Sequence, residues 1–270
     1  MDRGFVAHPL VVATLAFAAA AALGGPVVLA WWWRRRSGAP WSAFGWGMLV
    51  FFVSQCVLRL PWQIPLGNAL APRLRGSVAL SAAWIFVSAL TAAVWEECGR
   101  WAGYKWLVKR ERTFRVGVMY GLGHGGIEAI LLAGLSLAGT LVIYVLLAAH
   151  VPLALPAEAR AKLVAALSAL GPTDGLAVAA ERAMAMTCHV AMSLVVLQVF
   201  VRGSRAWLLL AILFHFLVDF TSVAGAAALK EHGPLVRELA VLPSAIAAAW
   251  IIARLRAHAR RRIEENSALG

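Results

Sequence analysis

Charged residues are scarce in this chain. Only 14% of the 270 residues are Asp, Glu, Lys or Arg, whereas 61% are hydrophobic and the mean hydropathy is +0.77. A soluble domain holds about 25% charged and about 45–50% apolar residues, so too few polar side chains are present here to cover a soluble core. Long apolar runs without two-residue alternation also exclude an outer-membrane barrel. The composition therefore predicts a polytopic helical membrane protein.

Cysteine and acidic residues are also few. The three cysteines lie in apolar segments and none has CxxC spacing, which argues against a disulfide framework or a thiolate zinc site. Asp and Glu number 13 against 25 Lys and Arg, giving a net charge of +12. The basic residues gather in short loops beside apolar runs, as is typical of membrane orientation. We therefore expect membrane lipid around the chain and no nucleic-acid partner.

Seven apolar segments are long enough to supply the roughly 20 residues that cross a bilayer. They lie at about 10–33, 41–66, 77–106, 116–150, 176–201, 206–229 and 235–255. Backbone groups in lipid must be satisfied internally, so each segment should be helical. The segment 116–150 is long for one helix, and a break at Gly134 and Gly139 would give eight segments. Residues 156–175 are typical of an amphipathic external loop.

The predicted fold class is thus all-α, with seven or eight transmembrane helices around a polar cavity. No polar linker separates folding units, so we expect a single transmembrane domain over residues 1–270, with its motif-bearing core at about 77–229. The first apolar run is followed by three arginines, which is the reverse of a cleavable signal peptide. It is therefore interpreted as an uncleaved span.

The ends of the predicted spans alternate between rich and poor in Lys and Arg, and this pattern predicts orientation. Four ends, at 34–36, 109–115, 202–205 and 254–262, hold 14 of the 25, and the intervening ends hold seven. Basic ends face the cytoplasm. The pattern predicts an external N-terminus and a cytoplasmic C-terminus.

Four of the spans carry ionisable residues, which are costly inside a membrane and usually mark function. These residues are Glu96, Glu97, Arg100, His124, Glu128, Glu181, Arg182, His189, His215 and Asp219. Counting from the basic ends at 1.5 Å per residue places Glu96, His124, His189 and His215 about 13–20 Å from the cytoplasmic edge of a ~30 Å core. We therefore expect side chains from four helices to converge on one layer near mid-membrane.

Helical spacing predicts three sets of partners in this layer. Arg100 follows Glu97 at i,i+3 and Glu96 at i,i+4, so it can pair with either carboxylate and leave the other free as a base. The remaining sets are the i,i+4 pairs His124 with Glu128 and His215 with Asp219. Glycines around His124 indicate close approach of another helix or of a substrate, or else a break in the helix.

Several of these features have ordinary structural explanations when taken singly. A lone Glu97–Arg100 pair is more often a structural ion pair, and a lone His189 more often a packing residue. Arg59, which precedes Leu-Pro-Trp, is interpreted as a snorkelling residue at the membrane interface. The combination of Glu96, His124 and His215 is what favours function.

The order of these motifs resembles the YhfC family of bacterial membrane proteins. The matching residues, between about 80 and 225, are Glu96-Glu97-x-x-Arg100, Gly-His124-Gly-Gly-x-Glu128-Ala, Glu181-Arg182 with His189 further on, and His215-x-x-x-Asp219. That family is considered a branch of the CAAX-protease and bacteriocin-processing superfamily. The usual first motif of the superfamily is Glu-Glu-x-x-x-Arg, so Arg100 stands one residue closer here, on a different part of the helix face.

This resemblance implies peptide-bond hydrolysis inside the bacterial inner membrane, on a peptide or membrane-protein substrate that the sequence does not identify. Carried over, Glu96 would be the general base and His124 its partner, while His215 with Asp219 would stabilise the oxyanion or orient water. A positioned carboxylate can take and return a proton, and histidine can donate to a developing oxyanion. The full candidate site comprises Glu96, Glu97, Arg100, His124, Glu128, His189, His215 and Asp219.

A zinc-dependent version and two other functions stay open. His124, His189 and His215, with Glu96 or Glu97, could supply nitrogen and oxygen ligands to zinc. HExxH is absent, so catalysis without a metal or other cofactor is favoured at this stage. A proton-coupled or metal-ion transporter is the second hypothesis, against which stands the lack of inverted repeats. A catalytically silent binding or immunity protein is the third.

Overall fold

The computed structural model describes residues 5–109 and 111–268, and within these ranges every regular element is a helix. Arg3 and Arg110, which the charge count includes, lie outside them. Six continuous helical stretches in the described chain are long and apolar enough to span a bilayer: α1 (Pro9–Ser37), residues 41–75, α4 (Val78–Trp106), residues 114–148, α8 (Pro172–Val201) and α9 (Ala206–Ala228). The predicted all-α, multi-pass fold is confirmed.

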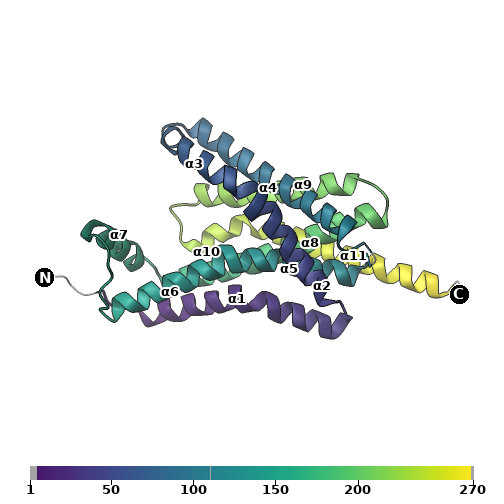
Figure 1. The fold of residues 1–270 in the computed structure, drawn as a ribbon, viewed down its shortest axis with the longest axis horizontal. Coiled ribbons are helices and arrows are strands. Elements are labelled where there is room, and N and C mark those ends of the chain that lie inside the picture. Colours follow the sequence, from purple (N-terminus) through teal and green to yellow (C-terminus); the bar gives the residue numbers. More distant parts are fainter. Residues whose placement is uncertain (1–4, 110, 269–270) are drawn as a thin grey trace.

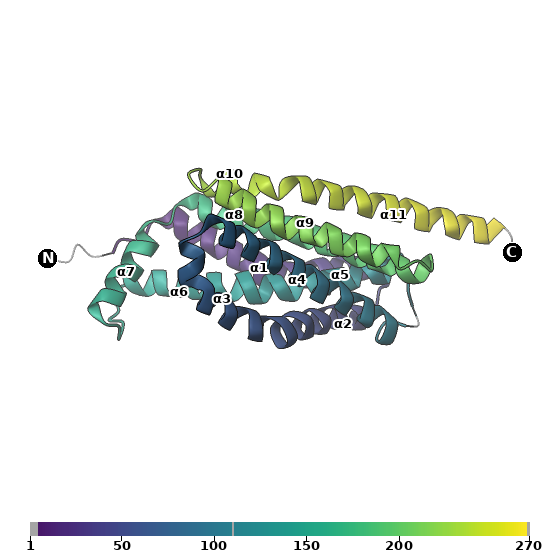
Figure 2. The ribbon, with the colours of Figure 1, turned by 90° about the horizontal axis from the view of Figure 1, so that it is seen from above.

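A seventh candidate span is bent near its start. It consists of α10 (Pro234–Arg237), the 3-10 turn η3 (Glu238–Ala240) and α11 (Leu242–Ala268), with an angle of 50° at the break. The structure therefore supports six spans, or seven if this bent pair crosses once. In Figures 1 and 2, α1 begins near one end of the bundle and α11 extends beyond the other.

Two of the spans are 35-residue helices with a π-helical stretch inside them. The first consists of α2 (Trp41–Phe51), η1 (Phe52–Arg59) and α3 (Leu60–Arg75), and the second of α5 (Phe114–Glu128), η2 (Ala129–Gly134) and α6 (Leu135–Ala148). In each, the residue after the π-helical stretch donates to the carbonyl five residues back, Leu60 to Gln55 and Leu135 to Ile130. The backbone groups stay paired, as lipid requires, so the region from 116 to 148 is one helix and does not break at Gly134 or Gly139.

The expected external loop at 156–175 is partly helical. It contains α7 (Ala157–Ser168), a short and mostly exposed helix that lies outside the candidate spans. Leu167 is its buried residue and joins an apolar cluster with Val11 of α1 and Tyr144 of α6. This contact attaches α7 to the end of the bundle where α1 begins (Figure 1).

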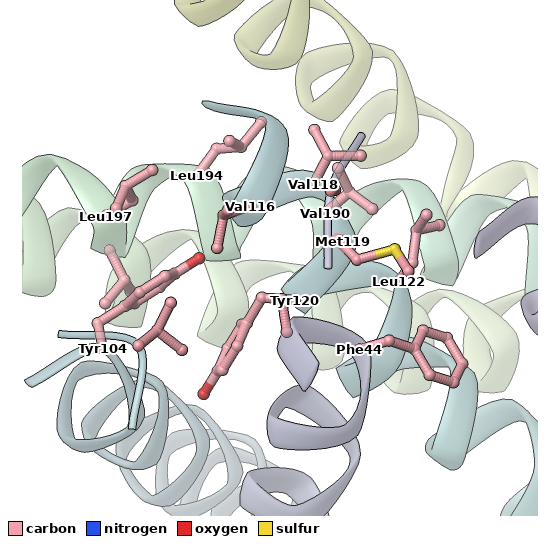
Figure 3. Close-up of a cluster of buried hydrophobic side chains, with 14 of the residues drawn as sticks. Phe44, Tyr104, Val116, Val118, Met119, Tyr120, Leu122, Val190, Leu194 and Leu197 are labelled. Carbon is pink, nitrogen blue, oxygen red and sulfur yellow. The ribbon is translucent and has the colours of Figure 1, made fainter. Parts of the chain in front are cut away.

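Helix α8 forms the centre of the bundle, with contacts to α1, α4, α5, α9 and α11. Its C-terminal half, from Cys188 to Val199, is buried continuously. Figure 3 shows Leu194 and Leu197 of α8 beside Tyr104 of α4 and Tyr120 of α5, whose rings have centroids 4.6 Å apart. Tyr120 of this apolar cluster precedes His124 by one helical turn, so the cluster packs against the polar layer.

Glycine lets α2 and α5 approach until their backbones touch. A Cβ on Gly47 would lie 2.1 Å from the carbonyl oxygen of Tyr120, and a Cβ on Gly123 would lie 2.0 Å from that of Phe44. Neither position accepts any larger residue without separating the helices. The close approach expected around His124 is therefore present, and its partner is helix α2.

Candidate functional site

A polar cavity of about 460 Å³ lies between the long spans. Its polar wall is made by side chains of η1, α4, α5, α8 and α9: Gln55, Arg59, Ser88, Glu96, Glu128, Glu181, Arg182, His189, His215, Asp219 and Ser222. Glu97, Arg100 and His124 are fully buried beside this wall. The structure thus brings the predicted residues of four helices into one connected cluster.

Glu96, His124 and His189 form the centre of this cluster. His124 Nε2 lies 2.9 Å from Glu96 Oε2, and the imidazole centroids of His124 and His189 are 5.4 Å apart. One potential ligand atom from each of the three residues lies within 4.8 Å of the other two, and all three side chains are buried. Two nitrogens and one carboxylate oxygen therefore converge at the edge of the cavity.

Arg100 bridges both glutamates instead of selecting one. Its guanidinium contacts Glu97 closely and lies 3.5 Å from Glu96 Oε2. Its Nη2 also lies 2.6 Å from His189 Nδ1. Because Arg100 is fully buried, these contacts supply the counter-charge that a cation in the membrane interior requires.

His215 lies on the other side of Glu97. Its Nδ1 is 2.6 Å from Glu97 Oε1, and its Nε2 is 3.6 Å from Asp219 Oδ2 and 4.0 Å from Glu96 Oε1. The i,i+4 relation of His215 and Asp219 thus places them near each other, at ion-pair rather than hydrogen-bond distance. Glu97 fixes the ring from one side, and the Nε2 edge faces the cavity carboxylates.

The predicted His124–Glu128 pair is wrong. Glu128 Oε2 instead lies 2.5 Å from His189 Nε2, and its Oε1 accepts from Arg182 Nη1 at 2.9 Å. The i,i+4 spacing allowed a contact with His124, but the guanidinium on α8 offers a stronger, charge-assisted partner. Within the described residues, His124 Nδ1 is left without a hydrogen-bond partner.

The three-histidine ligand set also differs from what the structure assembles. The group of potential ligand atoms in the described chain contains Glu96, His124 and His189, and His215 is not part of it. The reason is that Glu97 holds His215 by its Nδ1. Of the predicted set, the structure therefore keeps Glu96, His124 and His189 and leaves out the third histidine.

Arg59 is the residue that sequence reasoning missed. It was interpreted as an interface residue, yet its side chain is buried and lines the cavity. Its Nη1 donates to Gln55 Oε1 at 2.7 Å, and its Nη2 to the carbonyl oxygen of Ser88 at 2.7 Å. The available signal was Gln55, an amide four residues earlier in the same predicted span. Arg182, noted in its span but left out of the candidate site, holds Glu128 in the same cavity.

The chain matches a known family of membrane proteins. The profile of the family described as YhfC intramembrane metalloprotease matches residues 21–241. A Bacillus subtilis (strain 168) protein named "Uncharacterized membrane protein YhfC" is 30% identical over 169 residues, a match that covers 60% of this chain and 65% of that relative's length. No solved structure matches the chain. Since the family profile covers most of the sequence, the chain belongs to the YhfC family.

Proposed function

We propose that this protein is an intramembrane endopeptidase whose reaction takes place at Glu96, His124 and His189. The observation that carries the proposal is their convergence: two imidazole nitrogens and a carboxylate oxygen lie within 4.8 Å of one another beside a polar cavity in an apolar helix bundle. Hydrolysis inside a membrane needs such a cavity to hold water and a peptide. The family's description as a metalloprotease supports the same reaction.

The donor set fits a zinc ion. Two histidines and one glutamate are the protein ligands of a common class of catalytic zinc site. His189 also has the outer partner that metal-binding histidines commonly have, because its Nε2 faces Glu128, which Arg182 holds in turn. Glu96, His124 and His189 would hold the ion, and Arg100, whose Nη2 lies 2.6 Å from His189 Nδ1, would give up that contact. When bound, zinc polarises a carbonyl oxygen and increases the acidity of water.

The metal-free preference at the sequence level rested on the missing HExxH pattern. That pattern supplies two histidines and a glutamate from one helix, whereas here α4, α5 and α8 supply one ligand each. Local spacing could not reveal such a set, since its members are brought together only by packing. We therefore propose zinc as the cofactor.

Glu96 is suited to move the proton. Its Oε2 faces His124, while its Oε1 lies on the side of His215 Nε2. In the proposed reaction, Oε1 accepts a proton from the attacking water as the new C–O bond forms. The same oxygen returns that proton to the leaving amine as the C–N bond breaks.

In this proposal, His215 stabilises the oxyanion. Carboxylates lie on both sides of the ring, with Glu97 at Nδ1 and Asp219 and Glu96 at Nε2. An imidazolium, which donates from both nitrogens, matches this arrangement. Its Nε2–H would donate to the developing negative charge, and Asp219 would keep that edge of the ring turned toward the cavity.

Comparative N-terminal proteomics tests the proposal. Membranes from a bacterium that lacks the gene would be incubated in detergent with purified wild-type protein, with Glu96→Gln, or with Glu158→Gln, which changes an exposed residue of α7. New peptide N-termini should appear within membrane segments for wild type and Glu158→Gln and be absent for Glu96→Gln. Identical peptide sets from all three samples with added zinc would refute the proposal.

A further inference from the structure

Arg59 is a cation that no carboxylate neutralises by direct contact. Of the three arginines that belong to the cavity region, Arg100 contacts Glu96 and Glu97, and Arg182 contacts Glu128 and Glu181. In the part of the chain that the structure describes, no carboxylate oxygen lies within ion-pair distance of the Arg59 guanidinium. Glu96 and Asp219 line the same cavity and attract Arg59 through space, but neither contacts it. A buried cation without a contacting counter-charge is expensive, so its presence in a cavity wall suits a charged ligand.

The guanidinium is held in place by neutral acceptors. Nη1 donates to Gln55, Nη2 donates to the carbonyl of Ser88, and Nε lies 3.5 Å from the hydroxyl of Thr91. Gln55 and Arg59 both belong to the π-helical stretch η1. Contacts within η1 and to α4 therefore orient the Arg59 guanidinium, and all of these partners are neutral.

The remaining donors match one kind of ligand. Arginine carries five N–H groups, and three are used by these contacts, which leaves one on each terminal nitrogen. Two adjacent N–H groups in one plane fit the two oxygens of a carboxylate. We propose that Arg59 is a specificity-determining residue that binds a carboxylate of the peptide substrate.

The position of Arg59 sets the distance from this carboxylate to the reaction centre. Ser88, which anchors the guanidinium, and Glu96 are eight residues apart on α4, which corresponds to about 12 Å along the helix. An extended peptide covers that distance with about four residues. The inference rests on the proposed function, and it implies a free C-terminus or an acidic side chain about four residues from the cleaved bond.

Peptide binding to the Glu96→Gln protein tests the inference without requiring cleavage. The probes are three fluorescein-labelled hexapeptides rich in Leu and Ala: one with a free C-terminal carboxylate, its C-terminal amide, and an amide with Glu at the last position. Fluorescence anisotropy in detergent measures their Kd. Because a hydrogen bond to a charged group is strong, we expect at least one carboxylate peptide to bind about tenfold or more tightly than the plain amide.

Three variants in the Glu96→Gln background identify the cause of that preference. Arg59→Gln should bind all three peptides with equal affinity, and Arg59→Lys should recover part of the preference, since it keeps the charge without the fork. Arg73→Gln removes an exposed arginine of α3 and should leave the preference unchanged. Preference for the free acid alone assigns the site to a C-terminus, and preference for the Glu-amide alone assigns it to a side chain.

Other outcomes overturn the inference. The first is equal binding of all three peptides to the Glu96→Gln protein that keeps Arg59, and the second is no binding of any peptide to it. The third is a preference for carboxylate peptides that survives Arg59→Gln in a monodisperse sample. The proposed function is judged separately by proteolysis with the wild-type protein. An Arg59-dependent preference without any cleavage would refute the proposed function and leave the carboxylate site standing. Cleavage without the preference would support the proposed function and refute the carboxylate site.

Discussion

Replacing the two adjacent glutamates one at a time should separate chemistry from stability. Glu96→Gln keeps the size of the side chain and its ability to hydrogen-bond with His124, but removes the proton acceptor and the carboxylate proposed to bind zinc. Arg100 retains its close contact with Glu97 in this variant. We therefore expect a folded protein whose rate of peptide cleavage falls by about 10²–10⁴-fold, the usual range for loss of a general base.

Glu97→Gln should have the opposite profile. Glu97 is fully buried and is the shared partner of Arg100 and His215. Removing its charge leaves a buried guanidinium with only the more distant Glu96, and breaking a buried pair costs about 3–5 kcal/mol. The melting temperature in detergent should fall by on the order of 10 °C, with a smaller loss of turnover in the fraction that stays folded.

The assay pairs cleavage rate with thermal unfolding on the same purified samples. Glu111→Gln is the matched control, because Glu111 forms an exposed i,i+4 pair with Arg115 and such pairs contribute little. It should change neither rate nor melting temperature appreciably. If Glu97→Gln is well folded and inactive while Glu96→Gln still cleaves, the roles of the two glutamates must be exchanged.

Three further predictions concern metal, packing and orientation. Purified wild-type protein should contain about one zinc ion per chain by mass spectrometry. The His124→Ala and His189→Ala variants should lose this zinc, and His232→Ala, which changes an exposed residue, should keep it. Full zinc occupancy in all variants would place the metal elsewhere. Gly123→Ala, whose Cβ would meet the Phe44 carbonyl, should lower the free energy of unfolding by about 1–3 kcal/mol. Gly139→Ala, whose Cβ would have nothing within 4 Å, should leave that free energy unchanged or raise it by up to about 1 kcal/mol. Equal effects in thermal unfolding would refute the close α2–α5 packing. Topology reporters should read external after Thr173 and cytoplasmic after Arg36, Arg112, Arg205 and Arg262, and a cytoplasmic reading at Thr173 would reverse the orientation.

The sequence predicted which residues meet better than it predicted how they pair. Membrane class follows from hydropathy and length, because lipid leaves the backbone few alternatives. The count was less exact: seven or eight spans were expected, and the described chain has six, or seven with the bent pair. Convergence of Glu96, His124 and His215 followed from counting residues along helices. The partner of His124 did not, since helix rotation about its axis decides whether Glu128 or Glu96 reaches the ring, and rotation is set by packing between helices.

The two π-helical stretches were beyond sequence reasoning for a related physical reason. The first, from Phe52 to Arg59, contains no Gly or Pro that would mark it, and the second ends at Gly134, where the sequence suggested a break in the helix instead. The extra residues in a π-helical turn change which side of the helix later residues occupy. The Leu-Pro-Trp that follows Arg59 indicated the lipid interface, whereas Arg59 lies in the first π-helical stretch and lines the cavity.

The length of the two 35-residue spans bears on how deep the site lies. At 1.5 Å per residue such a helix measures about 52 Å, whereas the hydrocarbon core is about 30 Å thick. Helices this long fit a bilayer by tilting, by thinning it locally or by protruding from it. A tilted helix rises less per residue along the membrane normal, so His124 lies nearer to the water at the basic end than the 9 residues from Arg115 indicate. Hydrophobic mismatch would thus shorten the path by which water reaches the reaction centre.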